Sequence, residues 1–492
     1  MRSLLIKRIS ALTLCFLGIA GGLPAQTAEP PVQAQKPVDV QLNSKVVGNW
    51  LGTLQAGASK MRLGFHILVN GQGELSSTLD SLDQSVTGIL VRQTVFEDNI
   101  LSLDIASVGA RFQGTVSADG TEIAGTFVQG ASRRLTLTRV DRILLPVHSQ
   151  QPKPPYPYDA EDVSYSSGGV RLAGTLTLPR LSGPFPVVLL ISGSGPQDRD
   201  GTVAGHKPFW VIADYLTRRG IAVLRVDDRG TGQSEGRSIT QDFESFTQDV
   251  LSAVEYLKGR PDIDSKRIGV IGHSEGGTIG PMAAARSSDI AFVVMLAGPG
   301  TTGEEILSWQ ADAVARSAGQ PESAIALNRM VQAMTVRVIR SENDPKIATQ
   351  KMTDEWKAMK AELPQAQQNQ LNMASIDAAL ARQFEQANMP ELRAIVLSNP
   401  AEALRRIKVP VLALNGERDL QVPAAQNLRG VAIALAEADN QDVTTVALPG
   451  LNHLFQRCIT CQVAEYGDLE ETFSPDALAI VGDWVVAHTR TH

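Results

Sequence analysis

A serine flanked by two glycines lies where a nucleophile could be exposed. Gly272, Ser274 and Gly276 form a G-x-S-x-G pattern that follows an apolar run at 267–271 and precedes a helical stretch at 277–286. A strand-turn-helix context presents the serine hydroxyl on a sharp turn, where side chains at the two glycines would clash. The start of the helix also favours developing negative charge. We therefore expect Ser274 to be a nucleophile rather than part of a plain glycine-rich turn.

A serine nucleophile needs a base, and the base needs a group that orients it. On a sheet of this type the three residues follow one another in the order serine, acid, histidine. Asp419 stands just past an expected strand end, with Glu417 as the competing acid, and His453 stands on the loop after the last expected strand. We expect Ser274, Asp419 and His453 to form a catalytic triad, and prefer Asp419 to Glu417 for its place in the loop.

A tetrahedral intermediate also needs two backbone donors for its oxyanion. One is the N–H of Glu275, directly after the serine, and the other is expected in the glycine-rich segment 192–196. There we choose Ser194, with Gly195 as the next candidate. The sequence leaves open whether the Glu275 side chain bonds a neighbouring loop or steers the substrate. This chemistry needs no cofactor and no metal ion.

Two further patterns invite other interpretations. The glycine-rich stretch 230–236 resembles a dinucleotide fingerprint, but its spacing is one residue too long and no helix follows at once, so we expect a structural turn. Four aspartates could suggest a metal cluster, but salt bridges to nearby arginines are favoured. The residues concerned are Asp198, Asp200, Asp227 and Asp228, with Arg199, Arg225 and Arg229.

The first 28 residues have the three-part pattern of a secretory signal peptide. Basic residues precede an apolar run at 9–23, and small residues follow it. The run is too short to span a bilayer comfortably, although an uncleaved anchor is the alternative. We expect a signal peptide at 1–28, a linker at 29–45, no membrane span after cleavage, and a periplasmic or secreted protein.

Two cysteines, Cys458 and Cys461, remain after such cleavage. In an exported protein this Cys-x-x-Cys pair favours a disulfide over free thiols. A redox or metal role is the least favoured, because zinc would need further ligands at suitable spacing.

The expected elements place these residues in context. Residues 46–145 predict a small all-β barrel or sandwich, in which Trp50 and Phe65 are expected to pack in the core rather than line a ligand cup. Its apolar runs lie at 61–69, 100–106, 110–116, 123–127 and 135–138, with hairpin turns at Asn70-Gly71 and Asp119-Gly120. A proline-rich linker follows at 146–160.

The remainder alternates between apolar runs and helical stretches, which predicts a mostly parallel sheet flanked by helices. The runs lie at 185–191, 221–226, 267–271, 291–296, 409–414 and 443–448, after a leading hairpin at 163–166 and 170–178. This core falls into two parts, 161–300 and 406–492. Residues 301–405, between these two parts, have helical spacing and predict a helical cap over the site. We expect Met330, Met334 and Met352 of this cap to lie at an acyl pocket.

The chain length limits the number of globular units, and the net charge limits the class of binding partner. A chain of 492 residues is long enough for two or three globular units. Its 45 basic and 52 acidic residues give a net charge of −7, which weighs against nucleic-acid binding. The oligomeric state is left open.

Taken together, these motifs resemble the α/β-hydrolase superfamily, and more closely exported bacterial two-domain carboxylesterases with a small β-rich N-terminal domain. The matching stretches are 48–52, 192–200, 228–232, 272–277 and 451–453. The resemblance implies hydrolysis of short-acyl carboxylic esters, small-molecule substrates, through the Ser-His-Asp triad and an acyl-enzyme. A serine peptidase or aminopeptidase on the same fold and a non-catalytic binding protein remain the alternatives. The Cys-x-x-Cys so close behind His453 departs from this pattern.

Overall fold

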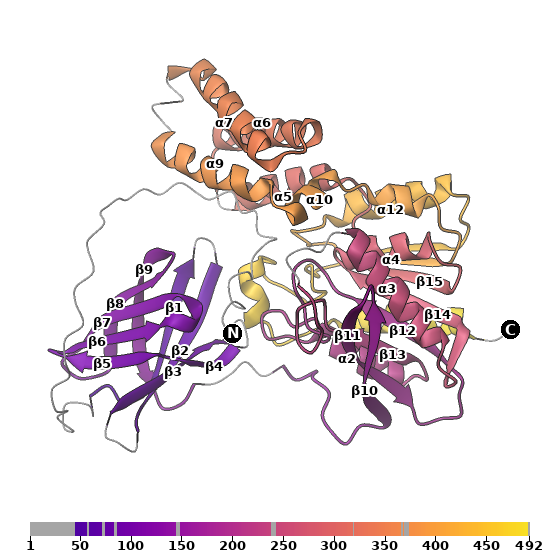
Figure 1. The fold of residues 1–492 in the computed structure, drawn as a ribbon, viewed down its shortest axis with the longest axis horizontal. Helices are drawn as coiled ribbons and strands as arrows, with labels where there is room; N and C mark the ends of the chain where they lie inside the picture. The colour runs from indigo at the N-terminus through magenta and orange to yellow at the C-terminus, as the bar shows by residue number, and fades with distance from the viewer. Residues whose placement is uncertain are drawn as a thin grey trace. The chain divides into compact units, whose positions relative to one another are not determined.

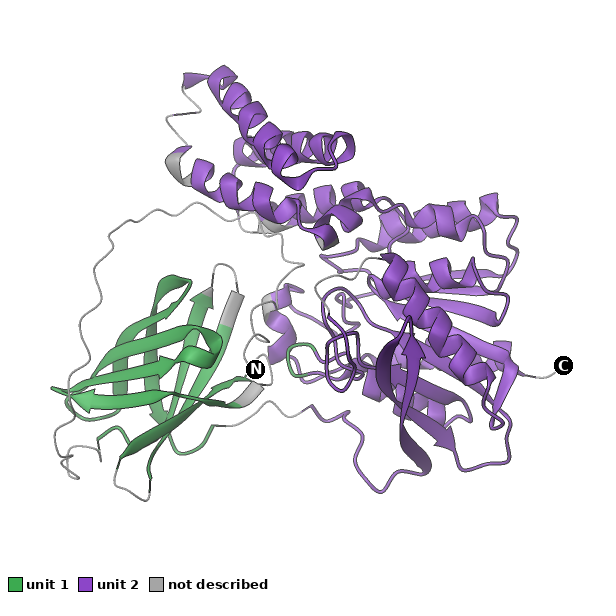
Figure 2. Cartoon of the chain, viewed as in Figure 1, with its two compact units in different colours: residues 1–9, 20–147, 203–205 green, residues 10–19, 148–202, 206–492 purple. Residues whose placement is uncertain are grey.

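The computed structural model describes residues 45–490 (Figure 1), apart from gaps at 57–58, 71–73, 83–85, 144–147, 238–242, 318, 366–367 and 369–372. The expected signal peptide and all but the last residue of the expected linker at 29–45 lie outside these residues. The described chain divides into two compact units (Figure 2), one formed mainly by residues before 148 and the other mainly by residues after it. None of the described helices is long and apolar enough to cross a membrane.

The first unit is a single nine-stranded antiparallel sheet in the order β4-β3-β2-β1-β9-β8-β7-β6-β5. Its strands are β1 (Gly48–Ala56), β2 (Ser59–Val69), β3 (Leu75–Ser81), β4 (Val86–Leu90), β5 (Gln93–Glu97), β6 (Ile100–Ile105), β7 (Ala110–Val116), β8 (Glu122–Gln129) and β9 (Ala131–Val140). Strands β1 and β9 pair in the middle of the sheet, and β4 and β5 form its two edges. The unit is therefore one curved sheet, a half-barrel, rather than a sandwich of two sheets. Near the two edges, Ser77 Oγ of β3 and Thr94 Oγ1 of β5 lie 2.6 Å apart.

The concave side of this sheet is filled by side chains. Trp50, Phe65 and Phe112 are almost completely buried there, and the Trp50 indole N–H donates to the carbonyl of Val46 at 2.7 Å. Trp50 and Phe65 are therefore core residues, as expected.

The second unit is built on an eight-stranded sheet in the order β10-β11-β13-β12-β14-β15-β16-β17. Its strands are β10 (Tyr158–Ser167), β11 (Val170–Pro179), β12 (Phe185–Ile191), β13 (Ala222–Val226), β14 (Ile263–His273), β15 (Ile290–Leu296), β16 (Val411–Gly416) and β17 (Val443–Leu448). The leading hairpin is antiparallel and the strands from β13 onward pair in parallel. This is the predicted α/β-hydrolase sheet.

Helices cover both faces of this sheet, as its near-continuously apolar strands require. The helices α3 (Phe243–Lys258), α4 (Gly276–Ala284) and α12 (Ala424–Glu437) pack on one face, and α2 (Pro208–Thr217) and α13 (Pro475–Thr489) on the other. Because the carboxyl ends of parallel strands meet at one edge, the loops after β12, β14, β16 and β17 converge there.

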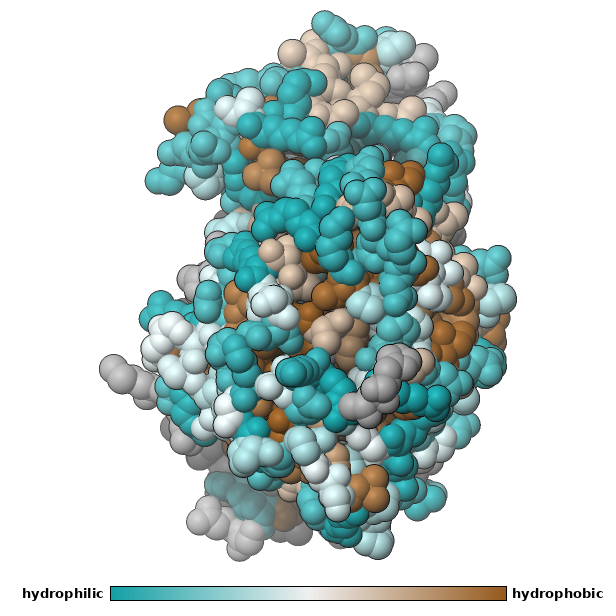
Figure 3. Space-filling model, turned by 90° about the vertical axis from the view of Figure 1, so that its right-hand side faces the viewer, coloured by the Kyte–Doolittle hydropathy of each residue, from teal (hydrophilic) through white to brown (hydrophobic). Residues whose placement is uncertain are grey.

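The predicted helical insertion lies between β15 and β16. It contains α5 (Gly303–Ser317), α6 (Glu322–Ser341), α7 (Pro345–Glu362), α9 (Met373–Ala387), α10 (Pro390–Leu397) and α11 (Pro400–Leu404). We call α5 to α10 the cap. On the face shown in Figure 3 its uppermost helices present mainly hydrophilic and weakly apolar residues, and its described exposed large apolar residues are Met330, Ile347 and Leu397.

The cap has a hydrophobic core of its own, separate from the two core layers on the sheet. Met334 and Met352 are buried in it, packed with Trp356 and Phe384. Met330 instead is 51% exposed. The expectation that Met334 and Met352 face an acyl pocket is therefore wrong, because helices that pack against one another use their apolar stripe for their own core.

Candidate active site

Ser274 sits on the turn between β14 and α4 in a backbone conformation that L-residues rarely adopt. Its φ is +54°, and its N–H donates to the carbonyl of Leu296 at 2.8 Å. The flanking glycines are required by close backbone contacts. A Cβ at Gly272 would lie 2.0 Å from the Gly276 carbonyl oxygen, and one at Gly276 would lie 2.4 Å from that of Ile191. Strain of this kind, held by a surrounding fold, is typical of functional sites.

Asp419 and His453 form a buried pair. His453 Nδ1 lies 2.7 Å from Asp419 Oδ2, and both side chains are almost completely shielded from solvent. The other carboxylate oxygen, Oδ1, accepts the backbone N–H groups of Gln421 at 2.7 Å and Val422 at 2.9 Å. Since the carboxylate accepts, Nδ1 carries the proton, and Nε2 is left as the base. The competing acid, Glu417, is exposed.

His273, the residue before Ser274, connects the serine turn with the His453 loop. Its Nε2–H donates to the carbonyl of His453 at 3.0 Å, and the two imidazole rings are 4.8 Å apart. Burial lowers the pKa of His273 to about 3, so this ring is a neutral donor. Among the described residues, no hydrogen bond joins Ser274 Oγ to the His453 ring; catalytic hydrogen bonds often tighten only when substrate binds.

The segment 192–197, which we call the oxyanion segment, lies beside the serine turn. A Cβ at Gly193 would be 3.3 Å from the Ser274 Cβ, so this glycine allows a close approach. Ser194 Oγ donates to Glu275 Oε2 at 2.7 Å. Of the two roles left open for the Glu275 side chain, the structure contains the bond to a neighbouring loop. Ser194 is thus joined to Glu275 beside the serine turn, and Gly195 follows Ser194 directly in the chain.

The four aspartates considered as metal ligands bond to neighbouring residues, and Asp228 accepts from Ser192 Oγ at 2.6 Å. The expected salt bridge from this group to Arg229 is wrong, because Arg229 pairs with Asp249. Asp227 Oδ2 accepts from Arg199 Nη2 at 2.7 Å, and Asp200 pairs with Arg225. Asp198 accepts the N–H groups of Asp200 and Thr202 within its own loop. The stretch 230–236 is a turn, in which a Cβ at Gly232 would lie 2.4 Å from Asp227 Oδ2.

Cys458 and Cys461 are joined by a disulfide in the loop after His453. The carboxylate of Glu465 accepts three successive backbone N–H groups of this loop, those of Ile459, Thr460 and Cys461, at 2.6–2.9 Å. The loop beside the histidine is therefore held by a covalent bond and by a carboxylate.

The sequence analysis missed a chain of contacts from the cap to the acid. Gln310 Nε2 of α5 donates to the Gln421 carbonyl at 2.6 Å, and Gln421 Nε2 donates to the Tyr466 hydroxyl oxygen at 3.0 Å. The Tyr466 carbonyl in turn accepts from His206 Nε2 at 2.8 Å. These contacts link α5 to the residues that hold Asp419. No motif marks them, because they join segments far apart in the sequence.

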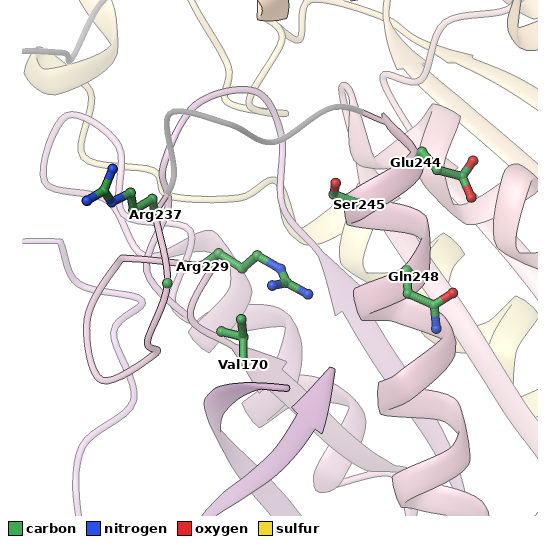
Figure 4. Close-up of a pocket in the computed structure, with 7 residues that line it drawn as sticks. Val170, Arg229, Arg237, Glu244, Ser245 and Gln248 are labelled. Atoms are coloured by element: carbon green, nitrogen blue, oxygen red, sulfur yellow. The ribbon is translucent and has the colours of Figure 1, made fainter. Parts of the chain in front are cut away.

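A separate pocket lies between the loop after β13 and the start of α3 (Figure 4). It is lined by Val170, Arg229, Gly236, Arg237, Glu244, Ser245 and Gln248. Arg229 is held there by Asp249 and Ser167. None of the predicted catalytic residues lines this pocket.

Comparison with known proteins gives a family for the hydrolase unit. A family model described as X-Pro dipeptidyl-peptidase (S15 family) matches residues 168–432. "Esterase EstD" of Thermotoga maritima is 36% identical over 156 residues, which are 32% of this chain and 36% of that protein. "Esterase FrsA" of Escherichia fergusonii is 31% identical over 132 residues, 27% of this chain and 30% of that protein. The match thus spans about a third of these relatives.

Among solved structures, the Pyrococcus furiosus esterase Pf2001 is similar with a TM-score of 0.42 and 17% identity. The similarity covers 68% of this chain and 92% of that one. The α/β-hydrolase GrgF from Penicillium has a TM-score of 0.40, 17% identity, and coverage of 67% and 99%.

Proposed function

The chain belongs to the X-Pro dipeptidyl-peptidase (S15) family, and from that premise we propose that it is a serine hydrolase, specifically a carboxylesterase for short-acyl esters. The observation that carries the proposal is the strained serine turn beside a buried histidine–carboxylate pair. The relatives EstD and FrsA, which are named as esterases, support the choice of an ester bond. Small-molecule esters are the proposed substrates.

The geometry suggests a role for each member of the triad. Ser274 Oγ attacks the ester carbonyl carbon while His453 Nε2 takes the hydroxyl proton, and Asp419 stabilises the imidazolium that forms. His453 then gives that proton to the leaving alcohol, which leaves an acyl group on Ser274. Water, deprotonated by His453, releases the acid. The backbone N–H groups of Glu275 and of Ser194 or Gly195 are the proposed oxyanion donors.

A peptidase is the second candidate, because the matched family model carries that name. An amide substrate requires protonation of a poor leaving amine, which an ester does not. Purified protein should therefore be labelled with a fluorophosphonate and assayed in parallel with nitrophenyl esters and X-Pro nitroanilides. Labelling with ester turnover and no cleavage of the X-Pro nitroanilides supports the proposal. Efficient cleavage of the X-Pro nitroanilides favours the peptidase even if activated esters react faster, and absence of both labelling and turnover favours a binding protein.

The preferred acyl chain is expected to be short. Gln310 of helix α5 donates a hydrogen bond to the carbonyl of Gln421, and the backbone N–H of Gln421 donates to Asp419. These contacts hold one helix of the cap close to Asp419. Each methylene buried in an apolar pocket contributes up to about 0.8 kcal/mol until the pocket is full. We expect kcat/KM for nitrophenyl esters to be highest between acetate and hexanoate and to be low for palmitate.

The same series measured with and without a lipid interface separates this enzyme from a lipase. A short-acyl esterase gains nothing from the interface, whereas a lipase lid opens there. A steady rise of kcat/KM to palmitate, or activation by the interface, would contradict the proposed acyl preference.

We also propose that the protein is exported. The residue pattern of the first 28 residues and the Cys458–Cys461 disulfide both fit an oxidising compartment. After expression of the full chain in a bacterium, the mature protein is expected outside the cytoplasm, with its first residue near position 29 by N-terminal sequencing. A cytoplasmic protein that retains residues 1–28 would show this proposal to be wrong.

A further inference from the structure

Glu275 is connected to both halves of the proposed oxyanion hole. Its backbone N–H, directly after Ser274, is one proposed donor. Its carboxylate accepts from the hydroxyl of Ser194 at 2.7 Å, and Ser194 belongs to the segment proposed to supply the other donor. Both residues are partly buried, which limits competition from water. A hydrogen bond to an ionised acceptor is shorter and stronger than a neutral one.

The oxyanion segment is also held at its two ends by the carboxyl group of Asp228, whose pKa burial raises to about 8. Asp228 Oδ1 accepts from Ser192 Oγ at 2.6 Å, and Asp228 Oδ2 accepts the backbone N–H of Gln197 at 2.8 Å. Between these ends lie Gly193, close to Ser274, and Gly195, whose φ of +84° places it in the left-handed region. In the middle of the segment the Ser194 carbonyl accepts from Gln197 Nε2 at 3.3 Å, a contact within the segment itself. The Ser194–Glu275 bond is the contact that ties this middle to the serine turn.

A carboxylate near a developing oxyanion would ordinarily be unfavourable. Here Glu275 stands at the N-terminus of α4, as the residue before the first helical position. The positive end of the helix dipole and the Ser194 hydroxyl both stabilise its negative charge. The carboxylate can therefore orient the segment at a reduced electrostatic cost to the transition state.

We propose that Glu275 is a positioning residue, whose carboxylate fixes Ser194 so that the backbone donors on the two sides converge on one oxyanion. This inference rests on the proposed serine-hydrolase function. It goes beyond the role of the Glu275 backbone N–H, because it assigns a task to the side chain. Preorganised donors stabilise the transition state more than the bound ester, so loss of this bond should affect kcat more than KM.

The test is a double-mutant cycle with Ser194→Ala, Glu275→Ala and the double variant, assayed on a nitrophenyl ester. Both single changes keep the backbone donors. We expect each to lower kcat about 10- to 100-fold, less than the 10²–10³ typical of deleting a donor, with KM within about 3-fold. The double variant should lose no more than either single variant. Affinity for a trifluoromethyl ketone, which mimics the tetrahedral intermediate, should fall by the same factor as kcat.

Two control variants test whether the loss of kcat comes from the Ser194–Glu275 hydrogen bond itself. Glu275→Gln keeps an oxygen that can accept from Ser194, so it should lose only about 2- to 5-fold in kcat. Ser117→Ala removes a similar serine–aspartate bond, the 2.6 Å contact with Asp119 in the β unit, and should leave kcat unchanged. If Glu275→Ala does not fold, Ser194→Ala and Glu275→Gln still decide the question.

Wild-type kcat in Ser194→Ala would overturn the inference. So would losses that multiply in the double variant, because Glu275 would then act independently of Ser194. If the wild-type protein neither reacts with a fluorophosphonate nor hydrolyses any ester or amide, the proposed function fails, and the inference fails with it.

Discussion

Replacing Ser274 by alanine is expected to lower ester turnover by about 10⁴- to 10⁶-fold and to leave the fold intact. Alanine removes only the hydroxyl. The close contacts of the turn involve Gly272 and Gly276, and the Ser274 N–H bond to Leu296 does not use the side chain. Without Oγ no acyl-enzyme can form, and what remains is the contribution of the oxyanion donors and of substrate binding.

The measurement is steady-state hydrolysis of a nitrophenyl ester, with circular dichroism and a thermal melt to verify folding. Ser265→Ala is the matched control, because Ser265 lies on the same strand but is exposed. This control should keep wild-type turnover and react with a fluorophosphonate, whereas Ser274→Ala should do neither. A pure Ser274→Ala protein with more than a few per cent of wild-type turnover would mean that another residue is the nucleophile.

Asp419→Asn is expected to lower kcat by about 10⁴-fold, whereas Glu417→Gln should stay within about 3-fold of wild type. In the wild type, Oδ1 of Asp419 accepts two backbone N–H groups, so the asparagine oxygen would take that position. The amide NH₂ would then point at His453 Nδ1 and donate to it. That contact favours the tautomer with its proton on Nε2, which cannot accept the serine proton.

Glu417 provides a matched control two residues away, since it is an exposed carboxylate. Both variants should be compared by kcat and by fluorophosphonate labelling rate on the folded proteins. An inactive Glu417→Gln protein together with an active Asp419→Asn protein would reassign the acid to Glu417.

Many strands and the serine turn could be predicted from local patterns in the sequence. The apolar runs of the hydrolase unit predicted its parallel strands, because a strand buried on both faces must be apolar throughout. The glycines around Ser274 predicted the turn, because their contacts are between neighbours in the chain. In the first unit, the apolar runs of the sequence predicted β2 and β6 to β9 but did not predict β1 or β3 to β5. Strands such as β3, with polar Ser77 and Asp80, depend on their cross-strand partners more than on their own pattern.

The sequence by itself therefore determined the fold class, the order of the elements and three residue types in a chain order suited to a triad. Only the tertiary structure decided which contacts those residues make. Burial separates Asp419 from the exposed Glu417, and helix packing within the cap takes Met334 and Met352 away from any pocket. The bond between Ser194 and Glu275 joins residues 81 positions apart. Such contacts follow from how strands align at one sheet edge, and no local spacing in the chain encodes them.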